Sequence, residues 1–291
     1  MSSLKNKKKV LILVLCSRNY LSKISSVAQQ SIWKSYMSDY KIIHFVGNYN
    51  QENRELNYID AGSDKYLLID TDDKYENIAL KTFLAFKEIY IRYEFDYIFR
   101  TNTSSFIDFN NFEKYIDNNS EKLSFSGIKL KVIEGDEIAS GAGIFLSRKN
   151  IKLILDNEKK FDFSLPDDVA IARLLKSFNI HPENSTRRDL KQIPSPSQIY
   201  NSSDFHYRCR LDPAYHRILE PQLMKYLNRA TKGSGIKVYL NYFLLNLVFF
   251  LSNLKFIFKI IQKFYSFKFY GELQIGNQLI YNKNLISRLK K

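Results

Sequence analysis

Short apolar runs alternate with longer polar stretches over the first hundred residues of the chain. Three of these runs cover Val10 to Leu15, Lys41 to Val46 and Tyr66 to Ile69, and a fourth lies at Tyr97 to Arg100. Apolar runs with this spacing are typical of repeating strand and helix units. They predict an α/β fold built on a parallel-type sheet.

The clearest helical pattern lies at residues 76–93. Ala79, Phe83, Phe86 and Tyr90 follow one another at intervals of four, three and four residues, so they share one face of a helix. Beyond this helix the pattern predicts a helix at 110–119, strands at 122–126 and 144–147, a polar loop at 134–137, a helix at 166–178 and a long polar loop at 182–203.

Three segments are candidates for a binding site. Ligands of open α/β sheets bind beyond the carboxyl ends of the strands. The chain leaves its first strand at 16–18 and its fourth at 100–105. The third segment, Ser140 to Gly143, precedes an apolar strand, and its small residues would let a ligand or another backbone approach closely.

Charge divides the chain into two parts. The formal net charge is +14 over 291 residues. Residues 232–291 hold ten Lys or Arg and a single acid, Glu272, which gives +9 and leaves +5 for residues 1–231. We therefore expect a catalytic domain at 1–231 and a basic C-terminal segment at 232–291.

The C-terminal segment has the pattern of a surface-binding helix. Residues 238–254 carry no charge, but three Asn and one Ser make this run marginal for a membrane-spanning helix. Lys255, Lys259 and Lys263 then recur at every fourth position among Phe, Ile and Tyr, as in a basic amphipathic helix. Such a helix either lies on an anionic membrane surface or packs on the catalytic domain or a second copy of the chain.

The remaining composition agrees with a cytoplasmic protein. The apolar run at 10–15 is too short for the core of a signal peptide. Two cysteines, Cys16 and Cys209, are too few for a disulfide framework and are compatible with a reducing cytosol. The predicted location is the cytoplasm, peripheral on the inner face of the cytoplasmic membrane.

Three motifs follow one another along the chain. The strongest stretch is Asp70 to Tyr115, with an acidic turn and the helix signature Asn-x-x-Leu-Lys-Thr at 77–82. The second motif is the Gly-rich strand at 140–147, and the third is the Asp-Asp-Val helix start at 167–169. In this order the three motifs resemble the beta-1,3-galactosyltransferase and Fringe-like family of inverting glycosyltransferases, and the resemblance covers roughly residues 8–181. The resemblance implies a GT-A fold: a Rossmann-like, nucleotide-diphospho-sugar transferase architecture with a central mixed sheet flanked by helices, here followed by an amphipathic helical tail.

One motif departs from the family. The family's metal-binding sequence Lys-Thr-Asp-Asp-Asp-Val-Phe is replaced by Arg-Thr-Asn-Thr-Ser-Ser-Phe at 100–106, with Asn102 and Ser104 at the altered positions. Mg²⁺ and Mn²⁺ favour anionic oxygens, whereas Asn and Ser offer uncharged ones. The sequence therefore predicts no metal site with assurance, and at most a weakly held Mn²⁺ or Mg²⁺.

The resemblance implies a role for each of the matched residues. Asp168, or its neighbour Asp167, would be the general base that takes the proton of the acceptor hydroxyl, although both acids are equally explained as stabilising a helix start. Gly141, Ala142 and Gly143 would lie under the acceptor. Donor binding would use the following residues: Ser17, Arg18, Asp70, Asp73, Asn77, Lys81, Arg100, Asn102 and Ser104.

A late basic segment supplies further candidates for donor binding. His206, Arg208 and Arg210 alternate with other residues and would share one face of a strand. Guanidinium groups can neutralise a diphosphate without a metal. The same pattern also fits a solvated basic edge strand.

The leading interpretation is a glycosyltransferase that moves a sugar, with inversion, from a nucleotide-sugar donor to a hydroxyl of a bacterial surface glycan such as capsule, lipopolysaccharide or O-antigen. The acceptor would be a glycan or a lipid-linked glycan. The alternative is a catalytically inactive glycan- or nucleotide-binding relative. We do not expect a nucleic-acid partner, because the positive charge lies in an apolar tail and no nucleic-acid-binding motif occurs.

Overall fold

The computed structural model describes residues 8–47, 58–61, 64–132, 136–212, 214–233 and 235–251, with the backbone alone for 58–61, 64, 65 and 215. Within these residues, an eight-stranded mixed sheet has the order β3-β4-β2-β1-β5-β8-β7-β9, and a smaller sheet has the order β10-β11-β6. The strands are β1 (Val10–Leu15), β2 (Lys41–Gly47), β3 (Tyr58–Ala61), β4 (Asp64–Ile69), β5 (Tyr97–Asn102), β6 (Ser105–Ile107), β7 (Phe125–Lys131), β8 (Glu137–Ser147), β9 (Glu183–Asn184), β10 (Arg188–Leu190) and β11 (His206–Cys209).

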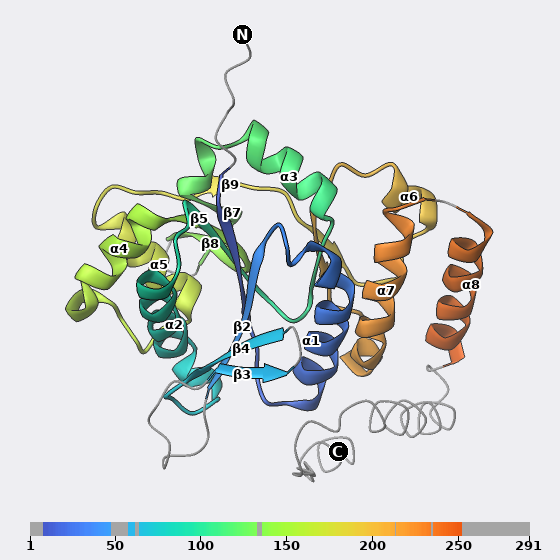
Figure 1. The fold of residues 1–291 in the computed structure, drawn as a ribbon, viewed down its shortest axis with the longest axis horizontal. Helices are drawn as coiled ribbons and strands as arrows, with labels where there is room; N and C mark the ends of the chain where they lie inside the picture. The colour runs from blue at the N-terminus through green and yellow to red at the C-terminus, as the bar shows by residue number, and fades with distance from the viewer. Residues whose placement is uncertain are drawn as a thin grey trace.

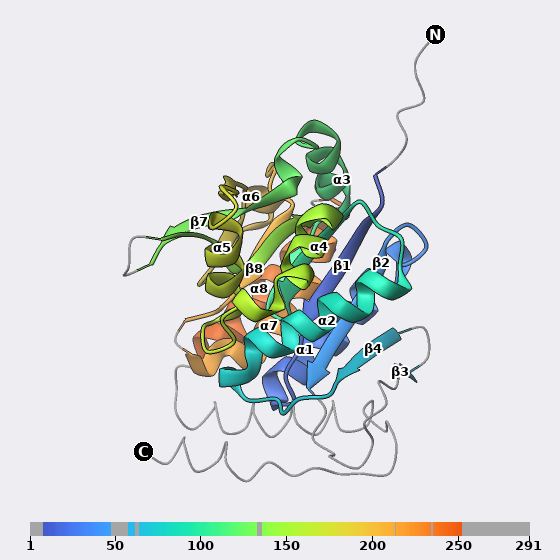
Figure 2. The ribbon, with the colours of Figure 1, turned by 90° about the vertical axis from the view of Figure 1, so that its left-hand side faces the viewer.

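Helices cover both faces of the large sheet. They are α1 (Tyr20–Trp33), α2 (Ile78–Arg92), α3 (Phe109–Asn118), α4 (Arg148–Asp156), α5 (Asp167–Lys176), α6 (Pro196–Tyr200), α7 (Glu220–Ala230) and α8 (Ile236–Leu251). Short 3-10 helices lie at Lys34–Tyr36, Tyr75–Asn77, Lys122–Ser124, Glu158–Lys160 and Ala214–Leu219. In Figure 1, α2, α4 and α5 lie on one side of the sheet, and α1 and α7 lie on the other. Figure 2 looks onto the side with α2, α4 and α5.

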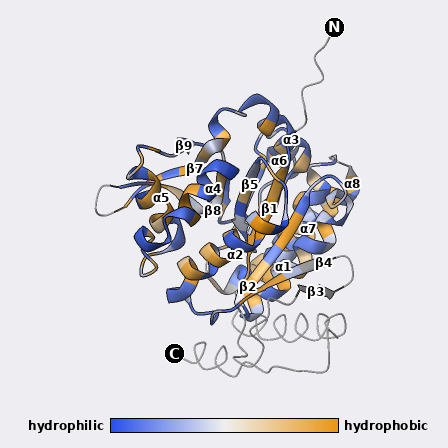
Figure 3. Ribbon diagram, turned by 60° about the vertical axis from the view of Figure 1, so that its left-hand side comes forward, coloured by the Kyte–Doolittle hydropathy of each residue, from blue (hydrophilic) through white to orange (hydrophobic). Residues whose placement is uncertain are grey.

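The alternation of side chains along β1 explains the two layers. Val10, Ile12 and Val14 point into the core beneath α1 and α7, and Leu11 and Leu13 point into the core beneath α2 and α5. A strand that is buried on both faces must be apolar at every position, which is why β1 reads as an unbroken apolar run. Figure 3 shows β1 in the orange of hydrophobic residues, whereas the helices around the sheet carry both orange and blue residues.

The predicted α/β fold with a mixed central sheet is confirmed. Strands β1, β2, β4 and β5 are parallel, as the spacing of the first four apolar runs predicted. Strand β8 is antiparallel to both β5 and β7, so the second half of the sheet is mixed. The carboxyl ends of the four parallel strands therefore lie at one edge, where the loops after β1, β2, β4 and β5 meet.

Several boundaries differ from the prediction. The strand expected at 122–126 begins at Phe125, because residues 122–124 form a 3-10 turn. The strand expected at 144–147 begins at Glu137, so the small residues 140–143 lie inside β8 instead of before it. The long loop expected at 182–203 contains β9, β10 and α6.

Helix α8 packs on α7 with one face. Val238 and Leu245 are buried in the core cluster that also contains the apolar side of α7. The rings of Tyr226 on α7 and Tyr242 on α8 lie 6.1 Å apart. Among the described residues, no helix is long and apolar enough to cross a membrane. The basic amphipathic pattern at 255–265 falls outside the described residues.

Candidate active site at the carboxyl edge of the sheet

A buried ion pair joins β5 to the start of α5. Arg100 is 1% exposed and Asp167 is 3% exposed. An Nη2 proton of Arg100 is donated to Oδ2 of Asp167, and the hydroxyl of Thr82 on α2 donates to the same oxygen at 2.7 Å. Burial raises the pKa of Asp167, while Arg100 acts to lower it. This pair ties together three elements and has no side-chain surface that a substrate can reach.

The neighbouring carboxylate, Asp168, faces the Gly-rich part of β8. Its Oδ2 accepts the backbone N–H of Gly141 at 2.8 Å, and its Oδ1 accepts the N–H of Val169. Arg100 also donates to the carbonyl oxygen of Gly141, so one peptide segment is held from both sides. A Cβ at position 141 would lie 2.9 Å from Oδ2 of Asp168, which explains the glycine there. Asp168 is partly exposed, unlike Asp167.

A second buried group lies against the next glycine of β8. Nε2 of His206 is 3.0 Å from Oγ of Ser105, and Oγ of Ser105 lies 2.7 Å from the hydroxyl oxygen of Thr101. A Cβ at Gly143 would come within 2.5 Å of the His206 ring. The carbonyl of Ala142 accepts from the Thr101 hydroxyl at 2.7 Å. Burial, followed by the nearby positive charges, lowers the pKa of His206 well below its usual value, so this imidazole is neutral.

The altered motif after β5 is closed by its own hydrogen bonds. Oδ1 of Asn102 accepts the backbone N–H of Ser104 at 3.1 Å and its hydroxyl at 2.7 Å. The motif offers no carboxylate, and Oδ1 of Asn102 already accepts two hydrogen bonds, so these residues do not fit a divalent cation. In the described part of the chain, no three His, Cys, Asp or Glu side chains gather in a way that could hold a metal ion.

Guanidinium groups gather beside this motif. Arg208 on β11 is paired across the small sheet with Ser105 and is followed by the exposed Arg210. Arg187 binds Asp189 at 2.6 Å through Nε and Ser140 at 2.9 Å through Nη1. Nη1 of Arg208 lies 3.7 Å from the same Asp189. Arg187 and Arg208 thus share one carboxylate, which leaves positive charge for an anion.

The electrostatics of Arg208 reflect this crowding. Burial lowers its pKa first, and the charges of Arg210 and Arg187 lower it further. Its buried Nε has no hydrogen-bond acceptor among the described residues. A buried donor without a partner is costly and is satisfied when a ligand supplies an acceptor oxygen.

A polar cluster also closes the edge after β1, β2 and β4. Lys81 donates to Oδ1 of Asp73 at 2.7 Å and to the carbonyl of Cys16 at 3.1 Å. Asp73 also accepts the backbone N–H groups of Arg18 and of Gly47. Nε of Arg18 donates to the carbonyl of Gly47 at 2.9 Å. Lys81 and Asp73 therefore satisfy each other and fix the loops of this edge.

The other expected donor residues lie around this cluster. Ser17 donates its N–H to Ser22 at 2.8 Å, at the start of α1. Asn77 donates to the carboxylate of Asp72, and Asp70 is exposed at the end of β4. The structure thus separates the expected residues into two groups: an edge cluster near Asp73, and a second cluster near Asp168.

Several participants were not expected from the sequence. Thr82 and Ser105 lie inside the motifs at 77–82 and 100–106 but were not among the candidate site residues. Arg187 and Asp189 have no spacing that connects them to the motifs, because they reach the site only when the chain around β10 is folded against β8 and β11. Alternation along 204–210 placed His206, Arg208 and Arg210 on one face of a strand; His206 and Arg208 do alternate in β11, whereas Arg210 follows the end of that strand. Nothing in the segment 182–203 marked Arg187 as a neighbour of these residues.

Comparisons with known proteins do not assign an activity to this chain. No protein-family model and no curated protein sequence matches this chain. Among solved structures, the galactosyltransferase LgtC in complex with donor and acceptor sugar analogues aligns with 79% of this chain and 99% of its own, at 9% identity and a TM-score of 0.41. A glycosyltransferase involved in glycosylation of the major capsid of PBCV-1 aligns with 75% of this chain and 98% of its own, at 9% identity and a TM-score of 0.43.

Both similarities are too low to carry an argument about activity. Neither of these two structures is described as a Fringe-like protein, so the particular family suggested by residues 70–115 and 140–169 stays a prediction. The functional argument rests on the site itself.

Proposed function

We propose that this chain is an inverting glycosyltransferase of the GT-A type, which transfers a sugar, a hexose in the leading case, from a nucleotide-sugar donor to a hydroxyl of a bacterial surface glycan such as capsule, lipopolysaccharide or O-antigen. The observation that carries the proposal is the partly exposed carboxylate of Asp168. It is fixed on the Gly-rich strand β8, beside a group of arginines with uncompensated positive charge.

The reaction is a single displacement at the anomeric carbon. Asp168 takes the proton of the acceptor hydroxyl while the acceptor oxygen forms a bond to that carbon. The bond between the carbon and the diphosphate oxygen breaks, and its electron pair leaves with the nucleoside diphosphate. Attack opposite the leaving group inverts the configuration. Asp168 rather than Asp167 has this role in the proposal, because Asp167 is already paired with Arg100.

Arginines take up the charge that develops on the leaving diphosphate. Arg208 has an unpaired Nε and, with the exposed Arg210, lies next to the altered motif at 102–104. Guanidinium groups bind phosphate oxygens through two parallel N–H donors. The proposal assigns Arg100 and Lys81 to structural ion pairs, since each is buried and matched by an aspartate.

The donor site is tested by calorimetry with the full chain. A panel of UDP-, GDP-, dTDP- and CMP-linked sugars is titrated with and without MnCl₂. We expect one nucleotide to bind, and Arg208→Gln to weaken its binding by about 10-fold or more, since a hydrogen bond to a charged group contributes about 1.5–3 kcal/mol.

The matched control for this test is Arg188→Gln. Arg188 lies on the neighbouring strand β10, but its guanidinium is bound to Asp204 at 3.0 Å and to the carbonyl of Gln198 at 3.1 Å. We expect this variant to bind the nucleotide as the wild type does. Equal weakening in both variants would show a general charge effect and would remove Arg208 from the site. The absence of binding across the whole panel would overturn the proposed function.

The proposal also places the protein on the inner face of the cytoplasmic membrane. Helix α8 exposes an uninterrupted apolar face opposite the side that packs on α7, formed by Ile236, Tyr239, Leu240, Phe243, Leu244, Leu247 and Phe250. The sequence from residue 232 onward adds a net charge of +9. An apolar face combined with positive charge favours an anionic lipid surface over a second copy of the chain, which would carry the same charge.

Vesicle flotation tests the membrane proposal. We expect binding to vesicles that contain phosphatidylserine and little binding to pure phosphatidylcholine. Phe243→Ser combined with Phe250→Ser should reduce the bound fraction several-fold. Ile91→Ser is the control, because Ile91 is an equally exposed apolar residue on α2. Dimerisation that depends on the two Phe residues, without vesicle binding, would contradict this part of the proposal.

A further inference from the structure

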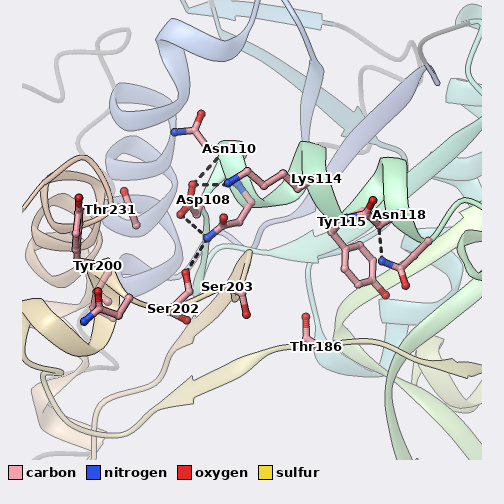
Figure 4. A pocket seen from close by; sticks show the side chains of 14 residues that line it. Asp108, Asn110, Lys114, Tyr115, Asn118, Thr186, Tyr200, Ser202, Ser203 and Thr231 are labelled. Atoms are coloured by element: carbon pink, nitrogen blue, oxygen red, sulfur yellow. Dashed lines mark hydrogen bonds between the residues drawn. The ribbon is translucent and has the colours of Figure 1, made fainter. Parts of the chain in front are cut away.

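A hollow outside the proposed active site has the lining of a carbohydrate site. Its volume is about 740 Å³, within the range of small-molecule sites. It is bordered by α3, by the chain before β10, by α6 with the residues that follow it, and by the end of α7. Figure 4 shows side chains from these separate segments pointing into one space.

Side-chain amides and hydroxyls dominate this lining. Five of the fourteen lining residues are asparagine, and Ser, Thr and Tyr supply six hydroxyl groups. Lys114 and Asp108 are the charged members, one of each sign. An amide both donates and accepts, as does a hydroxyl, so such a lining matches a ligand with many neutral hydroxyl groups. It lacks the excess of cations that a phosphate would need and the apolar walls that an acyl chain would need.

Part of this hydrogen-bonding capacity is unused. The amides of Asn110, Asn118 and Asn201 take part in no hydrogen bond within the described residues, and all three are exposed. By contrast, Asn111 is fixed, because its Nδ2 donates to Asp108 at 3.0 Å and to the carbonyl of Ser202 at 3.1 Å. Asn111 is therefore held in place by its own hydrogen bonds, whereas the amides of Asn110, Asn118 and Asn201 are available to a ligand.

An aromatic ring lies at the rim as well. Tyr200 ends α6 and is 55% exposed, although large apolar surfaces are normally covered. The face of a tyrosine ring is apolar and its hydroxyl is polar, so it can cover the C–H face of a pyranose while bonding to its hydroxyls.

The hollow adjoins the proposed active site through three segments of chain. Thr186 lines the hollow, and the next residue, Arg187, binds Ser140 in the site. Ser203 lines the hollow, and His206 follows three residues later. Asp108 lines the hollow three residues after Ser105, the partner of His206. The hollow and the proposed active site are therefore joined by stretches of one to three residues in three segments of the chain.

We propose that this hollow binds a neutral oligosaccharide, as a subsite for the part of the acceptor glycan remote from the reacting hydroxyl. Its role as an acceptor subsite rests on the proposed glycosyltransferase function, whereas glycan binding itself does not. The two ideas are tested separately, by glycan titration and by nucleotide titration.

The test measures binding of maltohexaose, chitohexaose and a β-1,4-linked galactohexaose to the full chain by saturation-transfer NMR and calorimetry. Hexagalacturonate and inorganic pyrophosphate serve as anionic comparisons. We expect at least one neutral hexasaccharide to bind, and Tyr200→Ala and Asn118→Ala each to weaken its binding at least 5-fold. Tyr75→Ala is the control, because Tyr75 is an exposed tyrosine that does not line the hollow.

The outcomes are distinct. Failure of all three neutral hexasaccharides to bind, binding of the anionic probes alone, or binding that survives both pocket substitutions would each overturn the carbohydrate subsite. Nucleotide binding by Tyr200→Ala should equal that of the wild type. A chain that binds glycan at the hollow but no nucleotide would leave this site standing and overturn the proposed transferase.

Discussion

The buried pair of Arg100 and Asp167 makes the sharpest prediction about stability. Replacing Asp167 by Asn keeps the volume of the side chain and removes its charge, which leaves the Arg100 cation buried without a counter-ion. Arg100 is 1% exposed, so water cannot compensate. Breaking a buried pair at one partner costs about 3–5 kcal/mol, a large part of the about 5–15 kcal/mol that stabilises a typical domain.

A double-mutant cycle measures the coupling free energy between Arg100 and Asp167, apart from their other contacts. We expect Asp167→Asn and Arg100→Met each to be strongly destabilising, and the combined variant to lose at least about 2 kcal/mol less than the sum of the two, because no unpaired charge is left. The assay is urea unfolding followed by circular dichroism at constant pH. The control cycle uses Lys152 and Asp156, a pair on α4 in which both side chains are more than half exposed, where the coupling should stay below about 0.5 kcal/mol.

Additive effects at the buried pair would refute this reasoning. They would mean that Asp167 and Arg100 are each satisfied by other groups. In that event the Gly141 carbonyl, which Arg100 also contacts, would become the principal partner of this arginine.

Three further predictions concern titration and packing. Burial raises the pKa of Glu220 to about 7, so the neutral carboxyl is favoured in the folded state. As pH rises from 4 to 8, the free energy of unfolding of the wild type should fall by about 3 kcal/mol relative to Glu220→Gln. Equal pH profiles of the two proteins in urea unfolding would contradict this. Burial lowers the pKa of His44 to about 3, so the neutral ring stabilises the fold above pH 6.5. About 4 kcal/mol of the free energy of unfolding should be lost between pH 6.5 and 3 in the wild type, and this loss should be absent from His44→Gln. Gly143→Ala places a methyl group against His206 and should lower the free energy of unfolding by about 1–3 kcal/mol. Gly235→Ala is the control, because a Cβ there would lie in open space and should change the free energy of unfolding little. Similar values for the two variants in urea unfolding would contradict the close packing at position 143.

Local pattern predicted the sheet well because its strands are buried on both faces. The apolar run at 10–15 corresponds to β1 with the same ends, and the run at 41–46 to β2 with one residue fewer. The polar stretch at 182–203 carried no comparable pattern. Strands β9 and β10 there have two and three residues, too short for alternation to be visible.

The site could be predicted only in part. Motif resemblance and strand ends drew attention to 100–105, 140–143 and 167–168, and the structure brings these three segments together. The sequence does not show which of the neighbouring acids Asp167 and Asp168 is buried, because their exposures depend on how α5 packs against β5 and β8. Likewise, Arg100 and Lys81 carry charges suited to a phosphate, but their partners Asp167 and Asp73 are 67 and 8 residues away and become visible only in the fold.

Release of nucleoside diphosphate from the bound nucleotide sugar tests the central claim most directly. The wild type and Asp168→Asn are compared in the presence of a pool of short oligosaccharide acceptors, with Asp162→Asn as the control, since Asp162 is an exposed acid in the loop before α5. We expect Asp168→Asn to lower the rate by about 10²-fold or more, the usual contribution of a general base, while nucleotide-sugar affinity stays within about 3-fold. Turnover that is unchanged in Asp168→Asn, or absent from a wild type that binds the donor, would contradict it, and the second result would identify the chain as an inactive nucleotide-binding relative.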